Sequence, residues 1–423
     1  MMTSDQDSIV VIGGGAAGMM AALSAAREGA RVTLLERNAK VGRKLYITGK
    51  GRCNVTNHCA AEEVLRNTPR NGKFLYSSMN AFPPEKTEQF FRQLGVPLKV
   101  ERGNRVFPVS DKAADIIDAL FVQLQREGIC LRQARATHIR TQGGAVTGVE
   151  TEQGLFPCKA VILATGGMSY PLTGSTGDGY RMAEELGHTI VPPAPSLVPL
   201  ESEDPACQRM QGLALKNVRV KVKTAVGKTV FDDQGELLFT HFGLSGPLIL
   251  SASAHMRAFA TEHYTVWIDL KPALEEKKLD ARLIRDLEAQ PNAQFGTILS
   301  GLVPRSMIGV LVERCGIPAD TRAHALRKEQ RRTLLEQLKQ FTIPISGPRP
   351  IAEAIVTSGG IKTAEINPKT MASRQAEGLF LAGELIDVDA YTGGFNLQIA
   401  WATGWAAGRG AAAFLRGQAG KEG

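Results

Sequence analysis

The sequence has no paired-cysteine motif and no histidine cluster. Its six cysteines are scattered along 423 residues, without a C-x-x-C pair and without histidines at metal-ligand spacing. We therefore expect no disulfide framework, no zinc site and no other metal centre. The cysteines are Cys53, Cys59, Cys130, Cys158, Cys207 and Cys315.

Long apolar runs are also missing. No uninterrupted apolar stretch reaches the roughly 18 residues of a membrane-spanning helix. The first residues, MMTSDQD, are polar and acidic, whereas a secretory signal begins with basic residues followed by an apolar core. The sequence thus predicts a soluble cytoplasmic protein without membrane association, and it leaves the oligomeric state open.

The composition is that of a globular protein. With 43% hydrophobic and 22% charged residues, the chain is neither disordered nor fibrous. Its length suggests two or three domains. The 44 glycines are about one residue in ten, against a usual ~7%. The formal net charge of +8 is compatible with an anionic partner.

A dinucleotide-binding fingerprint opens the chain. Residues 8–12 (SIVVI) form an apolar, β-branched run that leads into the turn GGGAAG and then into a helix of small residues. A second apolar run, residues 31–35, ends at Glu36, which lies 18 residues after the last glycine of the turn. Strand, glycine turn, helix, strand and acid in this order predict a Rossmann-type βαβ unit.

Each glycine of the turn has a separate task. Gly13 allows the tight turn, Gly15 lets a diphosphate approach the backbone, and Gly18 lets the helix pack against the sheet. The free N–H groups of the helix then face the diphosphate, and Glu36 is placed to accept hydrogen bonds from a ribose. The residues expected at the diphosphate are Gly13, Gly15, Ala16, Ala17 and Gly18.

The rest of the chain reads as a split α/β fold. Two more buried-strand patterns, residues 159–164 and 378–382, run into Thr165-Gly166 and Gly383-Glu384. Alternating runs such as VRVKV and TVWIDL predict an inserted antiparallel domain, and a Leu-, Arg- and Glu-rich stretch predicts a helical lobe. The expected parts are 1–191 and 362–423 for the nucleotide-binding domain, 192–273 for the β-rich substrate domain, 274–341 for the helical lobe and 342–361 for the return through the substrate domain.

Several long motifs resemble one family of flavoproteins. GGGAAG, ATGG followed by TGDGYRMAEELG, and GLFLAGE followed by GGFNLQIAWATG resemble the FAD-binding pattern of the fumarate-reductase-like branch of two-dinucleotide-fold flavoproteins. GRKLYITGKGRCNVTN, ERGNRVFP, LLFTHFGLSGP and TSGGI are similar to segments of the aminoacetone-oxidase/BaiN-like family. The resemblance covers nearly the whole chain and implies FAD as the cofactor.

The resemblance also implies which residues hold FAD. Glu36 would meet the adenosine ribose, Arg37 the edge of the adenine, and the backbone of Ala136 the adenine itself. Thr165 and Gly166 end a strand that crosses back over the cofactor, and Gly383 and Glu384 match the site that faces the ribityl chain. The residues that match the turn and helix start beneath the flavin ring are Gly394, Asn396, Leu397 and Gln398.

The positive charge is concentrated in two segments. Residues 40–73 carry a net +6, and residues 322–339 a net +4. In the first segment, Lys44 and Arg52 are candidates for the flavin diphosphate and ring edge, and Asn54 either hydrogen-bonds the flavin or caps a turn. The second segment is either a solvated helix face or a contact surface for RNA phosphates.

The chain has no second G-x-G-x-x-G after a strand. A separate NAD(P)H domain is therefore not expected, and NAD(P)H would reach the flavin only transiently. His241, in a glycine-rich turn, could donate a proton or hydrogen-bond its own turn. Cys53 could donate a proton near the flavin or be a buried, inert thiol.

Three functions remain open at this stage. The first is an NAD(P)H-dependent reductase of an activated C=C bond, acting on a small molecule or on a uridine of large-subunit ribosomal RNA to give dihydrouridine. The second is an oxidase of a small amine such as aminoacetone. The third is a non-enzymatic flavin redox sensor. Clustered basic charge favours an RNA substrate, whereas the absence of an RNA-binding module signature weighs against it.

Overall fold

The computed structural model describes residues 8–419, and the chain divides into two compact units. The first unit runs up to Ser196 and resumes at Pro350, and the second is Leu197–Arg349. Each has its own hydrophobic core.

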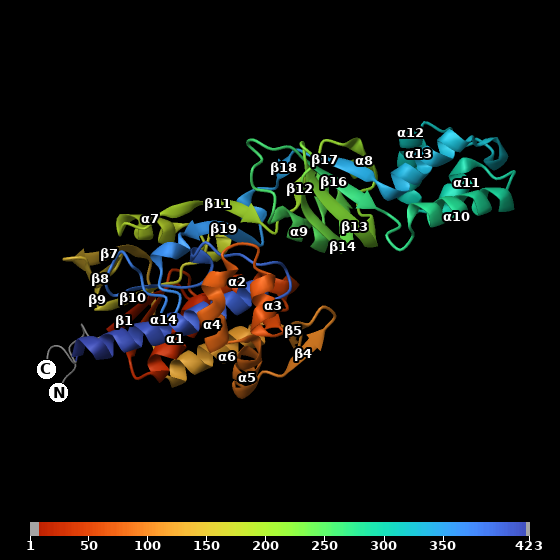
Figure 1. Ribbon diagram of the computed structural model, residues 1–423. Coiled ribbons are helices and arrows are strands. Elements are labelled where there is room, and N and C mark those ends of the chain that lie inside the picture. The colour runs from red at the N-terminus through yellow and green to blue at the C-terminus, as the bar shows by residue number, and fades with distance from the viewer. Residues whose placement is uncertain (1–7, 420–423) are drawn as a thin grey trace. The chain divides into compact units, whose positions relative to one another are not determined.

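The first unit contains a parallel five-stranded sheet in the order β20-β10-β1-β2-β6, of which β1 and β10 are labelled in Figure 1. Its middle strands are continuous apolar runs because both faces are covered, as parallel sheets require. The strands are β1 Ser8–Ile12, β2 Arg31–Glu36, β6 Cys130–Gln133, β10 Ala160–Leu163 and β20 Leu379–Leu381.

Two long helices pack against each other in the first unit, α1 Ala16–Arg27 and α14 Phe395–Ala419 (Figure 1). Their contact is close because α14 has glycines where it crosses α1. A Cβ atom on Gly404 would lie 2.3 Å from the carbonyl oxygen of Ala17, and one on Gly408 would lie 2.3 Å from that of Ala21. The C-terminal segment is thereby held beside the first helix.

Smaller elements complete the first unit. An antiparallel pair joins the two separate stretches of chain that form this unit, β11 Ile190–Ser196 and β19 Val356–Ile361. The other strands are β3 Thr56–Asn57, β4 Leu98–Glu101, β5 Arg105–Pro108, β7 Ala136–Gln142, β8 Ala145–Thr151 and β9 Gly154–Pro157. The other helices are α2 Arg43–Ile47, α3 Ala61–Arg66, α4 Tyr76–Ala81, α5 Pro84–Gln93, α6 Ala113–Arg126 and α7 Asp178–Glu185.

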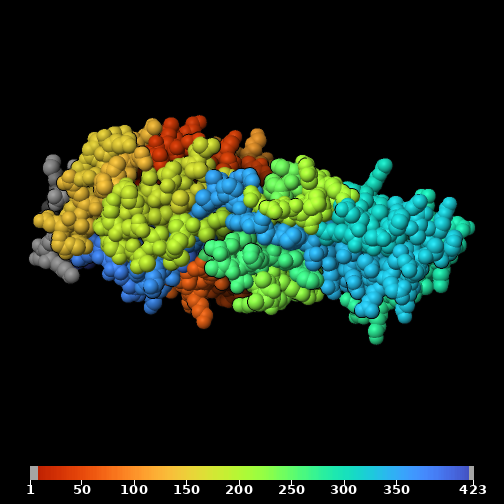
Figure 2. Space-filling view, turned by 90° about the horizontal axis from the view of Figure 1, so that it is seen from above, coloured from red at the N-terminus to blue at the C-terminus, as the bar shows by residue number. Residues whose placement is uncertain are grey.

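The second unit combines an antiparallel sheet with a helical lobe, whose residues are cyan in Figure 2. The strand order is β17-β16-β13-β14-β15-β12-β18. The strands are β12 Leu200–Glu201, β13 Ala214–Thr224, β14 Thr229–Thr240, β15 Gly243–Ser245, β16 Tyr264–Asp269, β17 Phe341–Ile345 and β18 Gly347–Pro348. The helices are α8 Pro205–Arg209, α9 Pro247–Ser253, α10 Glu276–Ala289, α11 Phe295–Ser300, α12 Arg305–Cys315 and α13 Lys328–Lys339.

The observed division between the units differs from the expected boundaries at 191 and 361. β11 and β19 lie on the first unit's side because they pair with each other, so the second unit begins at Leu197 and ends at Arg349. Side-chain alternation predicts a strand but not the sheet that it joins. Among residues 8–419, no helix is long and apolar enough to cross a membrane.

Candidate functional site

The glycine turn after β1 leaves open space at the N-terminus of α1. Gly13 has φ +107°, and a Cβ atom there would lie 2.5 Å from the Ala164 carbonyl oxygen. A Cβ on Gly18 would lie 1.8 Å from the oxygen of Gly13, so the helix packs directly on the turn. A Cβ on Gly15 would meet nothing within 4 Å, and no side chain caps this helix end. The unpaired N–H groups of the first helical turn, Ala16 and Ala17 included, suit an anion.

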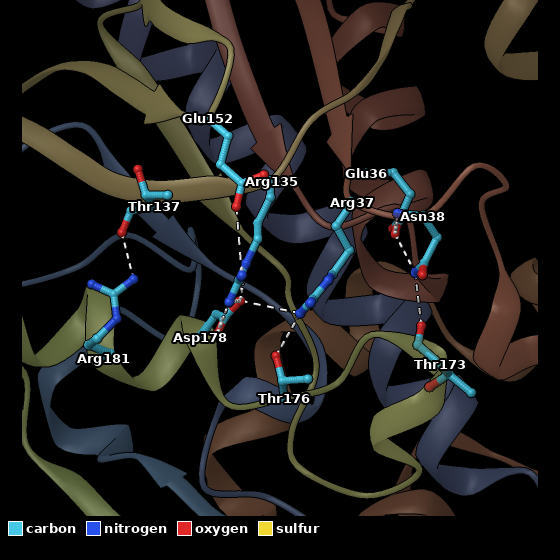
Figure 3. Close-up of polar contacts among 10 residues, drawn as sticks. All are labelled: Glu36, Arg37, Asn38, Arg135, Thr137, Glu152, Thr173, Thr176, Asp178 and Arg181. Carbon is cyan, nitrogen blue, oxygen red and sulfur yellow. Dashed lines mark hydrogen bonds and ion pairs between the residues drawn. The ribbon is translucent and has the colours of Figure 1, made fainter.

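Glu36, at the end of β2, hydrogen-bonds both the glycine turn and Asn38, and Figure 3 shows its contact with Asn38. Its carboxylate accepts hydrogen bonds from the Gly14 N–H at 2.8 Å, the Asn38 N–H at 2.8 Å and the Asn38 amide at 2.7 Å. An ionised carboxylate has about four acceptor positions. One position is therefore left for a ribose hydroxyl, while one bond holds the glycine turn and two hold Asn38 just beyond β2.

Beside Glu36, two arginines converge on one acid (Figure 3). Arg37 donates to the Thr176 hydroxyl at 2.7 Å and contacts Asp178 at 3.3 Å, and Arg135 contacts Asp178 at 3.2 Å. Ala136, the expected adenine neighbour, follows Arg135 directly and is buried. Sequence reasoning missed Arg135 and Asp178, although the TGDG turn that positions Asp178 was a usable signal.

Glu384 and Lys44 form an ion pair between segments 340 residues apart in sequence. The Lys44 ammonium lies 2.6 Å from the Glu384 carboxylate and 2.6 Å from the Ser169 hydroxyl. Ser169 and the Thr357 N–H each donate to Glu384 at 2.9 Å. Burial opposes ionisation of Glu384, but the charge of Lys44 and these hydrogen bonds outweigh it, so the pKa of Glu384 lies below its usual value.

Among the described residues of the first unit, three buried side-chain polar atoms have no hydrogen-bond partner: Thr165 Oγ1, Tyr180 Oη and Asp387 Oδ1. Thr165 borders the Gly13 turn and Gly179, whose Cβ atom would meet the Thr165 hydroxyl. Unpaired buried polar atoms cost free energy, and a bound ligand is one way to satisfy them. Of the three, Thr165 lies beside the glycine turn and is the candidate contact for a polar cofactor there.

Side chains and a close backbone contact fix the position of the start of α14. Gly394 has φ +99°, and its Cβ would lie 2.4 Å from the Thr56 oxygen. The Asn54 side-chain amide is assigned so that its nitrogen donates to the Thr56 oxygen and its oxygen accepts from the Gly394 N–H at 2.9 Å. Asn396 caps the preceding turn by accepting from Ala390 N–H at 2.9 Å.

Gln398, expected beneath the flavin ring, is fully buried. It accepts from the Thr56 and Thr87 hydroxyls at 2.7 and 2.8 Å and donates to the Phe82 oxygen at 2.8 Å. The amide therefore ties α14 to the loops around it. Leu397 is half-buried and packs against the core.

Arg52 is neutralised by two acids. It pairs with Glu101 and donates to Asp111 at 2.7 Å, and its guanidinium lies 4.1 Å from the centroid of the Phe107 ring. The hydrogen bond to Glu101 raises the pKa of Arg52 despite its partial burial. These partners make Arg52 a poorer candidate for the flavin diphosphate than the uncapped start of α1.

A family model described as the HI0933-like protein Rossmann domain matches residues 7–410. The chain belongs to the HI0933-like family. As a member of this family it is an FAD-dependent oxidoreductase.

Two HI0933-like relatives align over nearly their whole length. A 3-dehydro-bile acid delta(4,6)-reductase from Clostridium scindens is 33% identical over 96% of this chain and 98% of its own. A ribosomal RNA dihydrouridine synthase from Escherichia coli is 30% identical over 94% of this chain and 96% of its own. Among solved structures, a 3-ketosteroid delta1-dehydrogenase from Sterolibacterium denitrificans shares the fold, with a TM-score of 0.53 and 12% identity over 97% of this chain and 100% of its own.

The two candidate proton donors of this HI0933-like chain lie in different units. His241 is exposed in the turn between β14 and β15 of the second unit, beside the Phe242 ring. Cys53 belongs to the first unit and is fully buried, and burial raises the pKa of its thiol to about 12. We infer that Cys53 is an inert core thiol, whereas the role of His241 stays a hypothesis.

Cys53 is expected to resist alkylation in the folded protein. At pH 8 a thiol with a pKa near 12 is almost wholly protonated, and the thiolate is the reactive form. Iodoacetamide should leave Cys53 unmodified in the native protein, as measured by peptide mass spectrometry. The same treatment in urea should modify Cys53, and this sample is the control that the thiol can react. Rapid labelling of Cys53 in the native protein would restore it as a proton-donor candidate.

Proposed function

We propose that this protein is an FAD-dependent reductase of a C=C bond conjugated to a carbonyl, with NAD(P)H as a transient reductant. The observation that carries the proposal is the shared chemistry of the two full-length relatives. Their names give different substrates, a bile acid and a ribosomal RNA, but both reactions saturate a C=C bond. A reaction common to both is the best inference for a third member at comparable identity.

The residues of the first unit suit FAD. The open space at Gly15 and the uncapped start of α1 would receive the diphosphate, and the free acceptor position of Glu36 would receive a ribose hydroxyl. The buried Thr165 hydroxyl supplies an unused polar group beside the same turn. Bound FAD supplies the hydride chemistry, which no amino-acid side chain provides.

The protein's own part in this chemistry is positioning and charge. The positive end of the α14 dipole at Phe395 would stabilise negative charge on an electron-rich ring edge. Lys44 and Glu384 tie the loop of Ser169 to the start of strand β19 at Thr357, which fixes these two segments relative to each other. Reduction of a carbonyl-conjugated C=C bond also needs a proton, for which His241 is the remaining candidate from the sequence.

We favour a uridine of large-subunit ribosomal RNA as the substrate. The net charge of +8 suits a polyanion better than a steroid with at most one carboxylate. A steroid-like enone is the second candidate because the bile acid reductase is also a full-length relative, at 33% identity.

Anaerobic reduction of the purified yellow protein tests the reaction class. We expect NADPH or NADH to bleach the flavin absorbance, and aminoacetone to leave it unchanged. Reduction by aminoacetone alone would overturn the proposal in favour of an amine oxidase, and reduction by none of the three would favour a redox sensor.

Mass spectrometry of ribosomal RNA from a gene-deletion strain tests the substrate. Loss of one dihydrouridine from the large-subunit RNA, restored by the wild-type gene, is the expected result. Unchanged dihydrouridine would exclude the RNA substrate in that organism, and the steroid-like enone would then be assayed by NAD(P)H consumption.

A further inference from the structure

Acids inside and outside the two basic segments pair with many of their basic side chains. In residues 40–73, the basic side chains that pair with carboxylates are Lys44, Arg52, Arg66 and Arg70. In residues 322–339 they are Arg331, Arg332 and Lys339. The charge of a segment therefore overstates its attraction for a polyanion, and the place of an RNA contact has to be sought in the folded surface.

The solvent face of β13 carries a row of three basic side chains, Arg219, Lys221 and Lys223, which we name the β13 row. They alternate with the buried Val218, Val220 and Val222, which face the core of the second unit. This period of two puts all three cations on one face of the sheet.

Neighbouring strands add an aromatic ring and acids to this face. On β16, Trp267 lies opposite Lys221 and Asp269 lies opposite Arg219. On β14, Asp232 lies opposite Lys221. Residues directly opposite on paired strands share a face, so the β13 row and Trp267 form one continuous surface.

Two of the nearby cations already have carboxylate partners. Arg219 makes a two-pronged contact with Asp232, at 2.7 and 3.0 Å. Lys339 from α13 lies 2.5 Å from Asp269.

Lys221 and Lys223 differ from these two. Lys221 also pairs with Asp232, but at the longer distance of 3.6 Å and in competition with Arg219, and Lys223 Nζ lies 4.3 Å from the centroid of the Trp267 ring. These two ammonium groups are the ones best placed to take an external anion.

A shallow cavity of about 230 Å³ lies over the β13 row. Trp267, Asp269, Glu276, Lys339 and Gln340 complete its lining. Pockets that enclose a whole small-molecule ligand usually measure about 300–1,000 Å³. The space here suits one base or one phosphate of a longer chain, and the lining has four cations against the two acids Asp269 and Glu276.

We propose that the β13 row and Trp267 bind a single-stranded segment of RNA. Lys221 and Lys223 contact successive phosphates, and one base stacks on the Trp267 indole. Stacking displaces the Lys223 ammonium from the ring and frees it for the adjoining phosphate. Combined phosphate and aromatic contacts are the usual way in which proteins hold single strands. The inference rests on the RNA substrate proposed above and names where that RNA is held.

The test compares the full-length holoprotein with its K221E/K223E variant. Fluorescence anisotropy with a labelled single-stranded oligouridylate, over a series of KCl concentrations, should show at least a tenfold loss of affinity. The salt dependence should fall by about 1.4 in log–log slope, since each phosphate contact on a single strand contributes about 0.7. K362E/K369E, which changes the net charge equally at exposed positions of the first unit, should bind like wild type.

Each outcome decides one claim. Equal binding by wild type and K221E/K223E, or no binding by wild type, overturns the β13 site. If K221E/K223E loses flavin colour or melts early, K221Q/K223Q replaces it, and unchanged binding by that variant overturns the site equally. NADPH bleaching of the flavin should be the same in all variants, so a failure there concerns the proposed reaction and not the RNA site.

In the deletion strain, wild type and K362E/K369E should restore dihydrouridine and K221E/K223E should not. Restoration by all three genes overturns the β13 site, whereas restoration by none contradicts the RNA substrate.

Discussion

Replacing Gly15 by valine is expected to give a folded protein that no longer holds FAD. The backbone of Gly15 is extended, with φ −82° and ψ −170°, which an L-residue adopts without strain. Apart from its two chain neighbours, no residue of the described chain has an atom within 4 Å of a Cβ placed there. The added side chain therefore meets empty space in the protein but occupies the approach of the diphosphate to the N-terminus of α1.

The measurement separates cofactor binding from folding. The purified variant should lack flavin absorbance, and FAD titration should show at least a hundredfold weaker binding, which is about 2.7 kcal/mol. Without cofactor, the stability to urea of the variant should match that of wild-type apoprotein within about 0.5 kcal/mol. A variant that stayed yellow would contradict the assignment of this turn to FAD.

Gly18→Ala is the matched control in the same turn. Its Cβ would lie 1.8 Å from the Gly13 carbonyl oxygen, a backbone atom that cannot move aside as a flexible side chain can. This variant should lose stability whether or not FAD is present, by about 2 kcal/mol or more, because overpacking displaces the backbone. Gly18→Ala thus reports on packing and Gly15→Val on the ligand.

Replacing Lys44 by methionine should destabilise the first unit by about 3 kcal/mol. The side chains of Lys44 and Glu384 are only 21% and 20% exposed, and loss of the ammonium leaves a largely buried carboxylate with only neutral donors. The pKa of Glu384 should rise as its cation is lost. The loss in free energy of unfolding is measured by urea titration at neutral pH, with flavin release and circular dichroism as the two signals.

A double-mutant cycle isolates this pair. Glu384→Gln alone should also destabilise, whereas K44M/E384Q should be more stable than the sum of the two losses predicts, by at least about 1 kcal/mol. Additive effects would mean that the two side chains do not stabilise each other.

The pH dependence gives a second readout with a definite sign. The pKa of Glu384 is lower in the folded state than in the unfolded chain. Ionised Glu384 therefore stabilises the folded protein at pH values above the usual carboxyl pKa. This stabilisation is lost as the pH falls through the folded-state pKa. K44M should be less stable than wild type at neutral pH, and the gap should narrow on acidification. A gap that widened at low pH would contradict the ion-pair explanation.

Features that depend on residues close together in the sequence could be predicted from it. The spacing of Gly13, Gly15 and Gly18 between two apolar runs predicts the turn because each glycine answers a constraint within a few residues, and the structure has that turn. The alternation in residues 218–223 predicts a strand for the same reason, and β13 spans it. The family, the α/β class and the FAD chemistry follow from such motifs.

The tertiary structure alone decided which charges remain available. Arg52, a flavin candidate by sequence, is neutralised by Glu101 and Asp111. Lys44 forms an ion pair with Glu384, which is 340 residues away in the sequence. Coulomb and hydrogen-bond energies depend on distance in space, which the folded chain sets and sequence separation does not. For that reason the sequence by itself determined the nucleotide-binding turn, whereas the fold decided that Lys221 and Lys223 are better placed for a polyanion than the basic segments the sequence emphasises.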